Sequence, residues 1–249
     1  MRTMTINNIK YIKSLNQTKN RKKFGEFFIE GKRLIESSIL YNADIKNIYL
    51  TEKFINDNIF FKKLVLKNEI KIIKISSKDI QKISNTENPS GVAAICGIRK
   101  NKLKKVDNNN KLYLSEISDP GNLGTIIRSA AYFNFVDILL SKNCVDPYNP
   151  KVLRSGMGAH FKVNLFSNIE LETLRKSHTL IGADQRGENY NEVKFPKKYI
   201  LVLGNESHGL QEEILNILDT TISIKKTGYG ESLNVSAAGS ILMNYLSEK

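Results

Sequence analysis

The sequence predicts an α/β protein of two domains, in which a larger C-terminal domain with a parallel sheet follows a smaller α/β domain. Short apolar runs alternate with stretches of helical periodicity in both halves of the chain, as in folds built from repeated strand and helix units. Residues 99–110, RKNKLKKVDNNN, hold almost no apolar side chains, which is typical of a solvated linker. We therefore expect one domain over 1–98 and another over 111–249.

The first half predicts a basic stretch over 8–33 and then a compact domain. An apolar strand ends at Gly31 and leads into a helix, whose apolar side chains are Leu34, Ile35, Ile39 and Leu40. Further strands are expected at 45–50, 70–75 and from Ser90, with helices at 54–67 and from Ser77, where Asp79 would help the helix to start. About a hundred residues organised in this way suffice for a small domain.

The second half predicts a sheet with helices on both faces. Strands are expected at 111–117, 136–140, 163–166, 179–183, 199–203 and 221–226, and helices at 125–133, from Leu171 and at 235–246. Apolar strands separated by helices are typical of a mostly parallel sheet. Ligands bind such sheets beyond the carboxyl ends of the strands.

The composition allows either domain a core and favours a polyanionic partner. The chain has 249 residues, of which 41% are apolar, a formal net charge of +13 and a sequence pI near 9.5. Lysine and arginine that displace counterions from phosphates promote association with nucleic acids. A generally lysine-rich composition accounts for the same excess equally well, so basicity alone identifies no partner.

Targeting and cysteine signals favour a cytoplasmic protein that binds neither a membrane nor a metal. The first 13 residues lack the apolar core of a secretory signal, and no stretch approaches the roughly 18 apolar residues of a membrane span. Cys96 and Cys144 lie in unrelated contexts without a CxxC pattern or a nearby histidine pair. Both a disulfide framework and a zinc site are therefore disfavoured.

Polar residues follow predicted strands in three segments, of which the first is DPGNLGTIIRSA from Asp119. Pro120 and the glycines predict a tight turn, which places Asn122 at a helix start and Arg128 about one and a half turns further on. A glycine-rich turn with a solvent-exposed arginine would look the same. GNLG matches neither the GxGxxG nor the GxxxxGK[ST] pattern, so a phosphate-binding loop is disfavoured.

The second segment, LVLGNESHGL from Leu201, is an apolar strand that stops at Gly204 before a run of polar residues. A glycine and a carboxylate at this point favour close approach of the main chain to a ligand. Histidine suits acid–base catalysis because the ordinary pKa of its side chain lies near neutrality, but a single histidine beside a helix start, such as His208, is more often structural.

The third segment, ESLNVSAAGSIL from Glu231, places Ser232 and Asn234 directly before a helix. That composition is typical of a helix N-cap. The small side chains of Ala237, Ala238 and Gly239 would also let another part of the chain pass close to this helix.

Together these segments resemble the SpoU/TrmH family of RNA 2′-O-ribose methyltransferases, of the SPOUT superfamily, over residues 111–249. The resemblance implies a trefoil knot, S-adenosyl-L-methionine as the methyl donor and a homodimer. It implies that the catalytic residues are Asn122, Arg128, Glu206, Ser232 and Asn234. It implies that the cofactor-binding residues are Leu203, Gly204, Asn205, Ile224, Leu233 and Asn234. The chain departs from the family pattern at Ser207, where glycine is common, and at Lys225 and Lys226, where proline and methionine are common.

The first half resembles, over FFIEGKRLIE from Phe27, the ribosomal-protein-like RNA-binding domain that precedes many SpoU catalytic domains. A further segment from Asp146, DPYNPKVLRSGMGAHFKV, is similar to a family segment on the substrate side. These resemblances imply RNA contacts by Lys22, Lys23, Lys32, Arg154 and Ser155. We expect ribosomal RNA as the substrate before transfer RNA. An RNA-binding or ribosome-assembly protein that kept the fold without catalysis is the alternative.

Overall fold

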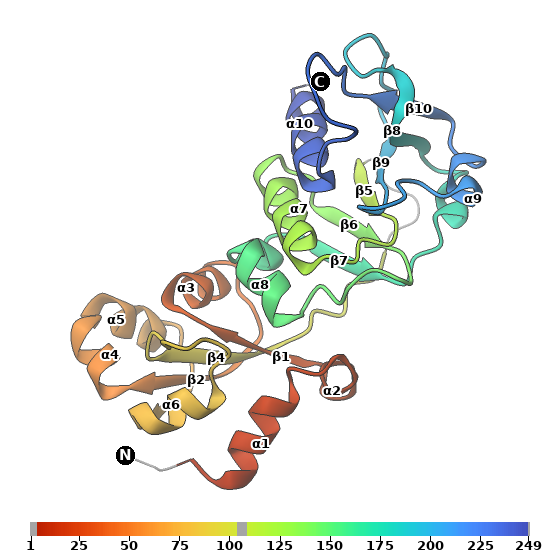
Figure 1. Cartoon of the computed structure of the whole chain (residues 1–249). Helices are drawn as coiled ribbons and strands as arrows, with labels where there is room; N and C mark the ends of the chain where they lie inside the picture. The colour runs from red at the N-terminus through yellow and green to blue at the C-terminus, as the bar shows by residue number, and fades with distance from the viewer. Residues whose placement is uncertain (1–3, 104–108, 249) are drawn as a thin grey trace. The chain divides into compact units, whose positions relative to one another are not determined.

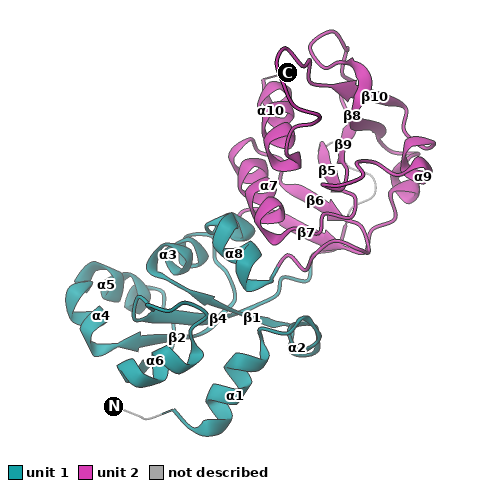
Figure 2. Ribbon diagram, viewed as in Figure 1, with its two compact units in different colours: residues 1–100, 148–161 teal, residues 101–147, 162–249 magenta. Residues whose placement is uncertain are grey.

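The computed structural model describes residues 4–103 and 109–248, which form two compact units (Figures 1 and 2). Unit 1 extends to Lys100 and includes residues 148–161, whereas unit 2 comprises 101–147 and the chain from Lys162 onward. Of the expected linker at 99–110, residues 104–108 lie outside the described residues. Residues 148–161 were predicted to lie in the second domain, but they pack in unit 1.

Unit 1 is built on a four-stranded sheet in the order β1 (Glu26–Glu30), β4 (Val92–Gly97), β2 (Ile45–Thr51) and β3 (Ile72–Ile75). The β1–β4 and β4–β2 pairs are antiparallel, and β2 and β3 are parallel. Side chains alternate between the faces, so Phe27 and Ile29 join one core and Phe28 joins the other. Gly31 has φ 99° and turns the chain from β1 into α3 (Lys32–Leu40).

Helices cover both faces of this sheet. One core contains residues of α3, α4 (Glu52–Asp57) and α5 (Ile59–Lys67), and the other contains residues of α1 (Ile6–Ser14) and α6 (Ser77–Ile83). The helix expected at 54–67 is interrupted because Asn58 has an extended φ of −136°, and its side chain donates to Phe54 O at the end of α4. Leu40 is exposed, contrary to its expected place on the apolar face of α3.

Two features of unit 1 differ from those that the sequence predicts. The helices α1 and α2 (Thr18–Phe24) lie before β1, where the sequence predicted no helix or strand. Ser76, and not Asp79, caps α6, since Ser76 Oγ accepts from the amide of Asp79 at 3.1 Å. Asp79 is buried and its carboxylate accepts from the amide of Met4, which attaches the start of the chain to α6.

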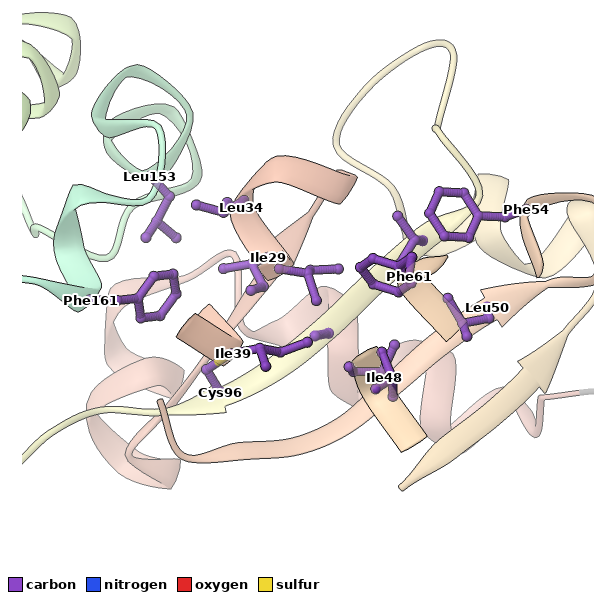
Figure 3. Close-up of a cluster of buried hydrophobic side chains, with 14 of the residues drawn as sticks. Ile29, Leu34, Ile39, Ile48, Leu50, Phe54, Phe61, Cys96, Leu153 and Phe161 are labelled. Carbon is purple, nitrogen blue, oxygen red and sulfur yellow. The ribbon is translucent and has the colours of Figure 1, made fainter. Parts of the chain in front are cut away.

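Residues 148–161 belong to unit 1 because their apolar side chains complete its core. This segment contains α8 (Pro150–Gly156) and the 3-10 helix η1 (Ala159–Phe161). Leu153 and Phe161 are buried in the same cluster as Leu34 of α3, as Figure 3 shows. Gly158 approaches α3 so closely that a Cβ atom would lie 2.6 Å from Ser37 Oγ. Such long-range packing leaves no mark in the local pattern from which the boundary was predicted.

Unit 2 contains the predicted parallel sheet, with six strands. Their order is β10 (Thr220–Ser223), β8 (Thr179–Asn189), β9 (Tyr199–Leu203), β5 (Lys111–Leu114), β6 (Asp137–Leu140) and β7 (Asn164–Ser167). Every neighbouring pair is parallel. The helices α7 (Pro120–Tyr132) and α10 (Val235–Ser247) lie side by side on one face (Figure 1). The opposite core includes α9 (Glu212–Leu215) and η2 (Leu171–Leu174), a 3-10 turn where an α-helix was expected.

The strand order creates a switch point between β5 and β9. From β5 the chain continues to β6 and β7 on one side of the sheet, and it later forms β8, β9 and β10 on the other. Connections that leave a parallel sheet in opposite directions open a crevice at the carboxyl ends of the two strands. The loops that follow β5 and β9 are therefore placed where a ligand site is expected.

Candidate functional site

The loop after β5 leads directly into α7. The side chain of Asp119 caps this helix, since Oδ1 accepts from the amide of Asn122 at 2.8 Å. Pro120 is the first helical residue, where its missing N–H removes no hydrogen bond. The predicted tight turn is wrong, because Gly121 and Gly124 lie inside the helix. Asn122 is thus the third helical residue, with its amide side chain at the carboxyl edge of the sheet.

The loop after β9 closes on itself. Asn205 and Gly209 exchange main-chain hydrogen bonds of 2.9 and 3.0 Å, and Asn205 Oδ1 accepts from the amide of Ser207 at 2.8 Å. A Cβ atom on Gly204 would lie 2.4 Å from the carbonyl carbon of Gly209. Glycine is therefore required at position 204 because the loop packs against itself, whereas the sequence predicted close approach of the main chain to a ligand.

A hydrogen-bond network joins the three segments through Glu206. Its Oε1 accepts from Asn122 Nδ2 and from the amide of Asp119, both at 3.1 Å. Its Oε2 accepts from the amide and the hydroxyl of Ser118 at 3.3 Å each. Asn122 Oδ1 then accepts from Asn234 Nδ2 at 3.0 Å. Three side chains predicted from separate segments thus form one chain of contacts.

Hydrogen bonding keeps Glu206 ionised. Burial alone would raise the pKa of this carboxyl group. Bonds from its own amide, from Asn122 and from the amides of Asp119 and Ser118 outweigh burial and lower the pKa below its ordinary value. A carboxylate with a lowered pKa is a weak base. Glu206 is consequently better suited to orienting Asn122 than to removing a proton.

Asn234 serves both as a helix cap and as a member of this network. Its Oδ1 accepts from the amide of Ser236 at 2.9 Å at the start of α10, as the N-cap interpretation predicted. Its Nδ2 reaches Asn122 as described above. The cap therefore fixes the amide orientation, and Asn122 is held from two sides.

Two predicted catalytic residues lie outside the network. Arg128 is exposed on α7, and Ser232 is exposed two residues before Asn234. Within residues 4–103 and 109–248, neither side chain has a hydrogen-bond or ion-pair partner. Both are accordingly available to a bound substrate.

Small residues allow the close packing that was predicted for the last helix. A Cβ atom on Gly239 would lie 2.7 Å from Leu203 Cδ1 of β9. Ser129 of α7 and Ser240 of α10 are joined through their hydroxyls at 2.7 Å. This contact holds the helix that carries Arg128 against the helix that Asn234 caps.

The predicted cofactor residues surround the same edge of the sheet. Leu203 and Gly204 are buried, and the side chain of Asn205 is used within the loop and by the carbonyl of Glu116. Ile224 is half-buried after β10, whereas Leu233 is 52% exposed. Residues 203–205 therefore set the conformation of the main chain at the end of β9. Ile224 and Leu233 offer apolar surface to a ligand.

The segment between β10 and α10 fits an adenosine group. Among the described residues, main-chain groups of 225–233 form no hydrogen bond with other main-chain groups, and the carbonyl of Gly230 accepts from Lys226 Nζ at 2.7 Å. Adenine has apolar faces and a polar edge, and it needs main-chain donors and acceptors beside apolar side chains. The main chain of residues 225–233 provides the donors and acceptors, and the side chains of Ile224 and Leu233 provide the apolar surface. S-adenosylmethionine therefore fits this segment.

The two departures from the family pattern lie in the loop after β9 and in the segment after β10. Ser207 does not have a positive φ, so its backbone needs no glycine, and its amide donates within the loop. Lys225 and Lys226 are exposed. The ammonium group of Lys226 donates to the carbonyl of Gly230, within the segment between β10 and α10.

The predicted RNA-binding residues all lie in unit 1. Lys22 and Lys23 are exposed on α2, and Arg154 is exposed on α8. Lys32 is exposed at the start of α3, where Nζ donates to Asn58 Oδ1 at 3.0 Å. The hydroxyl of Ser155 donates to Lys151 O at 2.9 Å within its own helix, so an RNA contact would compete with that bond.

The described residues contain no group of three or more His, Cys, Asp or Glu side chains that could hold a metal ion. Within the same ranges, no helix is both long and apolar enough to cross a membrane.

Family models match both halves of the chain. Residues 109–244 match the SpoU rRNA Methylase family, and residues 7–94 match the MRM3-like substrate binding domain. The second match covers most of unit 1 and agrees with the predicted substrate-binding role of the first half.

Individual proteins are similar over the full length or over part of it. The 23S rRNA (guanosine(2553)-2′-O)-methyltransferase RlmP of Bacillus subtilis is 30% identical, and the alignment covers 96% of this chain and 95% of that protein. The mitochondrial rRNA methyltransferase 3 of Mus musculus is 35% identical over 62% of this chain and 38% of its own length.

Solved structures confirm the predicted SPOUT fold. A protein described as a TrmH-family RNA methyltransferase from Porphyromonas gingivalis matches with a TM-score of 0.83 and 25% identity, over 97% of each chain. The SpoU methyltransferase AviRb of Streptomyces viridochromogenes matches with a TM-score of 0.85 and 21% identity, again over 97% of each chain.

Proposed function

Because this chain belongs to the SpoU rRNA Methylase family, we propose that it transfers a methyl group from S-adenosylmethionine to the 2′-hydroxyl of a ribose in ribosomal RNA. The observation that carries this proposal is the network of Asn122, Glu206 and Asn234, which joins the three family segments at the switch point of the sheet. The name of the Bacillus subtilis relative makes 23S rRNA the first RNA to test.

The site residues would position the ribose and stabilise developing charge. S-adenosylmethionine supplies a methyl group that is already activated by its sulfonium. Asn122, held by Glu206 and Asn234, offers a fixed amide for orienting the ribose. Arg128 is exposed and unpaired among the described residues. A guanidinium does not lose its proton in a protein. Arg128 therefore binds the adjacent phosphate or stabilises the forming alkoxide, and phosphate or solvent takes the proton.

Unit 1 would bind the RNA through its first two helices. Between Met4 and Gly25 the chain carries no acidic residue, and its exposed cations include Lys22 and Lys23 of α2. The Nζ atom of Lys23 lies 5.3 Å from the ring centroid of Phe24, which is 42% exposed. Cations beside an accessible aromatic ring suit phosphates and unstacked bases.

The test is transfer of labelled methyl groups into unmodified 23S rRNA, 16S rRNA and tRNA in separate reactions. We expect label in 23S rRNA, and the modified ribose should resist alkaline cleavage at its 3′ side because its 2′-hydroxyl is blocked. If alkali still cleaved the bond on the 3′ side of the labelled nucleotide, the methyl group would lie on a base, and the proposal would be contradicted. Label in tRNA alone would leave the reaction intact and overturn the assignment to ribosomal RNA.

Cofactor binding separates this proposal from the non-catalytic alternative. An RNA-binding protein that lost catalysis has no need of S-adenosylmethionine. Titration calorimetry of the full chain should detect binding of the cofactor and of its demethylated product. Absence of both, with RNA binding intact, would favour the alternative.

We also propose that the chain is a homodimer assembled through α7 and α10. On the outer side of this helix pair, Tyr132 is 83% exposed and Ile241 is 38% exposed. The hydroxyl contact between Ser129 and Ser240 brings these two apolar residues onto neighbouring turns. Arg128 and Tyr132 are four residues apart and share one side of α7. A partner that covers Tyr132 would therefore also approach Arg128.

Sedimentation analysis should find a species of twice the 28.3 kDa chain mass. Tyr132→Asp and Ile241→Asp should each weaken self-association at least about tenfold, since a buried unpaired charge costs several kcal/mol. Leu40→Asp is the control, because Leu40 is also an exposed apolar residue, at 71%, but lies on α3. A wild-type monomer, or equal weakening by the control, would contradict this interface.

We keep the cytoplasm as the proposed location. Both cysteines of the chain, Cys96 and Cys144, are free thiols, as suits a reducing compartment. Fractionation of the source cells would test this location.

A further inference from the structure

Glu116, immediately beyond β5, has a backbone conformation that few glutamates adopt. Its φ is 56°, in the left-handed region that is uncommon for residues other than glycine, asparagine and aspartate. Strained residues of this kind persist where the surroundings hold them, and they cluster at functional sites. The main-chain groups of Glu116 are both held, since the amide donates to Ser141 Oγ at 2.9 Å and the carbonyl accepts from Asn205 Nδ2 at 2.7 Å.

The left-handed turn directs the Glu116 carboxylate toward two neighbouring loops. Oε1 accepts from Asn143 Nδ2 at 2.6 Å, beyond β6. Oε2 accepts from Gln211 Nε2 at 2.9 Å and lies 3.4 Å from His208 Nε2, both beyond β9. The hydrogen bond from Asn143 contributes most to lowering the pKa of this carboxyl group, so it is ionised at neutral pH. One residue therefore connects the carboxyl ends of β5, β6 and β9.

The 205–211 loop is consequently held at two places. Glu206 attaches it to the start of α7. Glu116 attaches it to the end of β5, since its main-chain carbonyl accepts from Asn205 and its carboxylate accepts from Gln211. We propose that Glu116 is a positioning residue of the methyl-transfer site, which fixes the 205–211 loop and thereby the main chain of 203–205 and the carboxylate of Glu206. This inference rests on the proposed function but makes predictions of its own about the loop.

The substitution Glu116→Gly separates positioning from stability. Glycine adopts a φ of 56° without strain, so the melting temperature should stay within a few degrees of wild type. The carboxylate contacts with Asn143, His208 and Gln211 are lost, whereas the main-chain carbonyl of residue 116 can still accept from Asn205. The KM for S-adenosylmethionine should rise about tenfold and kcat should fall by a similar factor. Glu116→Gln keeps one acceptor oxygen and should recover part of both changes. Glu213→Gly, at an exposed glutamate of α9, is the control, and it should lower stability without changing KM.

Hydrogen exchange provides a readout that needs neither cofactor nor RNA. The amides of Asn205 and Gly209 are bonded across the loop and should exchange about tenfold faster in Glu116→Gly, while amides of β8 stay protected. If loop exchange and KM both match wild type, the proposed role is wrong. If wild type transfers no methyl group but the loop still loosens in the variant, the proposed function fails and the structural role of Glu116 stands.

Discussion

Replacing Arg128 with alanine should reduce methyl transfer about 10²- to 10³-fold at saturating substrate, the range found when a single charge-stabilising donor is removed from an active site. Arg128 is exposed, and among the described residues its side chain has no hydrogen-bond or ion-pair partner. The substitution therefore removes no polar contact of the folded protein, and the melting temperature should stay within about 1 °C. Single-turnover transfer into the RNA substrate measures the effect without interference from product release.

The pH dependence of the rate tests how Arg128 acts. If it stabilises the forming alkoxide or grips the phosphate, Arg128→Ala should lower the rate by one factor across the pH range. Arg128→Lys, which keeps the charge but not the planar donor geometry, should recover only part of the rate. If Arg128 were the proton acceptor, the variant would change the shape of the profile. Arg175→Ala, at an exposed arginine beyond η2, should leave the rate unchanged.

Much of the sheet could be predicted because its strands are locally apolar. Leu112, Leu139 and Val202 lie in short apolar runs, and the pattern alone places them in a covered parallel sheet. The convergence of Asn122, Glu206 and Asn234 could be anticipated from the resemblance, since parallel strands bring their carboxyl ends to one edge. Alternation of strands and helices does not by itself determine the order of the strands in the sheet. The switch point between β5 and β9 could therefore not be predicted from the sequence.

What could not be predicted depends on contacts between distant residues. The segment 148–161 joins unit 1 because Leu153 and Phe161 fill its core, and local composition shows only a basic loop. Asp119 rather than the glycines sets the start of α7, since its carboxylate caps the helix. The contacts of Glu116 could not be predicted because its partners Asn143 and Gln211 are 27 and 95 residues away in the sequence.

Replacing Glu206 with alanine should affect both stability and activity. The carboxylate accepts hydrogen bonds from Ser118, Asp119 and Asn122, and removing it leaves these donors to solvent. Bonds to a charged group contribute about 1.5–3 kcal/mol when intact. Because this site is partly exposed, we expect a loss of about 1–2 kcal/mol, which corresponds to a fall of roughly 2–8 °C in the melting temperature. Transfer should fall about 100-fold because Asn122 loses one of its two supports.

The matched variant Glu206→Gln isolates the charge. Glutamine has the same shape as glutamate, but its NH₂ group would replace one of the two oxygens that accept hydrogen bonds. That NH₂ group would face hydrogen-bond donors. The loss of stability, measured without cofactor, should therefore approach that of the alanine variant. Glu213→Gln, at an exposed glutamate of the same unit, should change neither stability nor transfer. If Glu206→Gln transferred methyl groups as fast as wild type, the negative charge of Glu206 would not contribute to catalysis.

The pH dependence of stability follows from the sign of the pKa shift. The folded pKa of Glu206 lies below its ordinary value of 4.5, so ionised Glu206 stabilises the folded state above pH 4.5. That stabilisation is lost as the pH falls below 4.5 and through the folded pKa. Glu206→Gln lacks this contribution, whereas Glu116 titrates in both proteins and cancels in their difference. The difference in melting temperature between wild type and Glu206→Gln should therefore narrow as the pH falls from 5 toward 3. A constant difference over that range would mean that the Glu206 carboxylate gains nothing from ionisation in the folded protein.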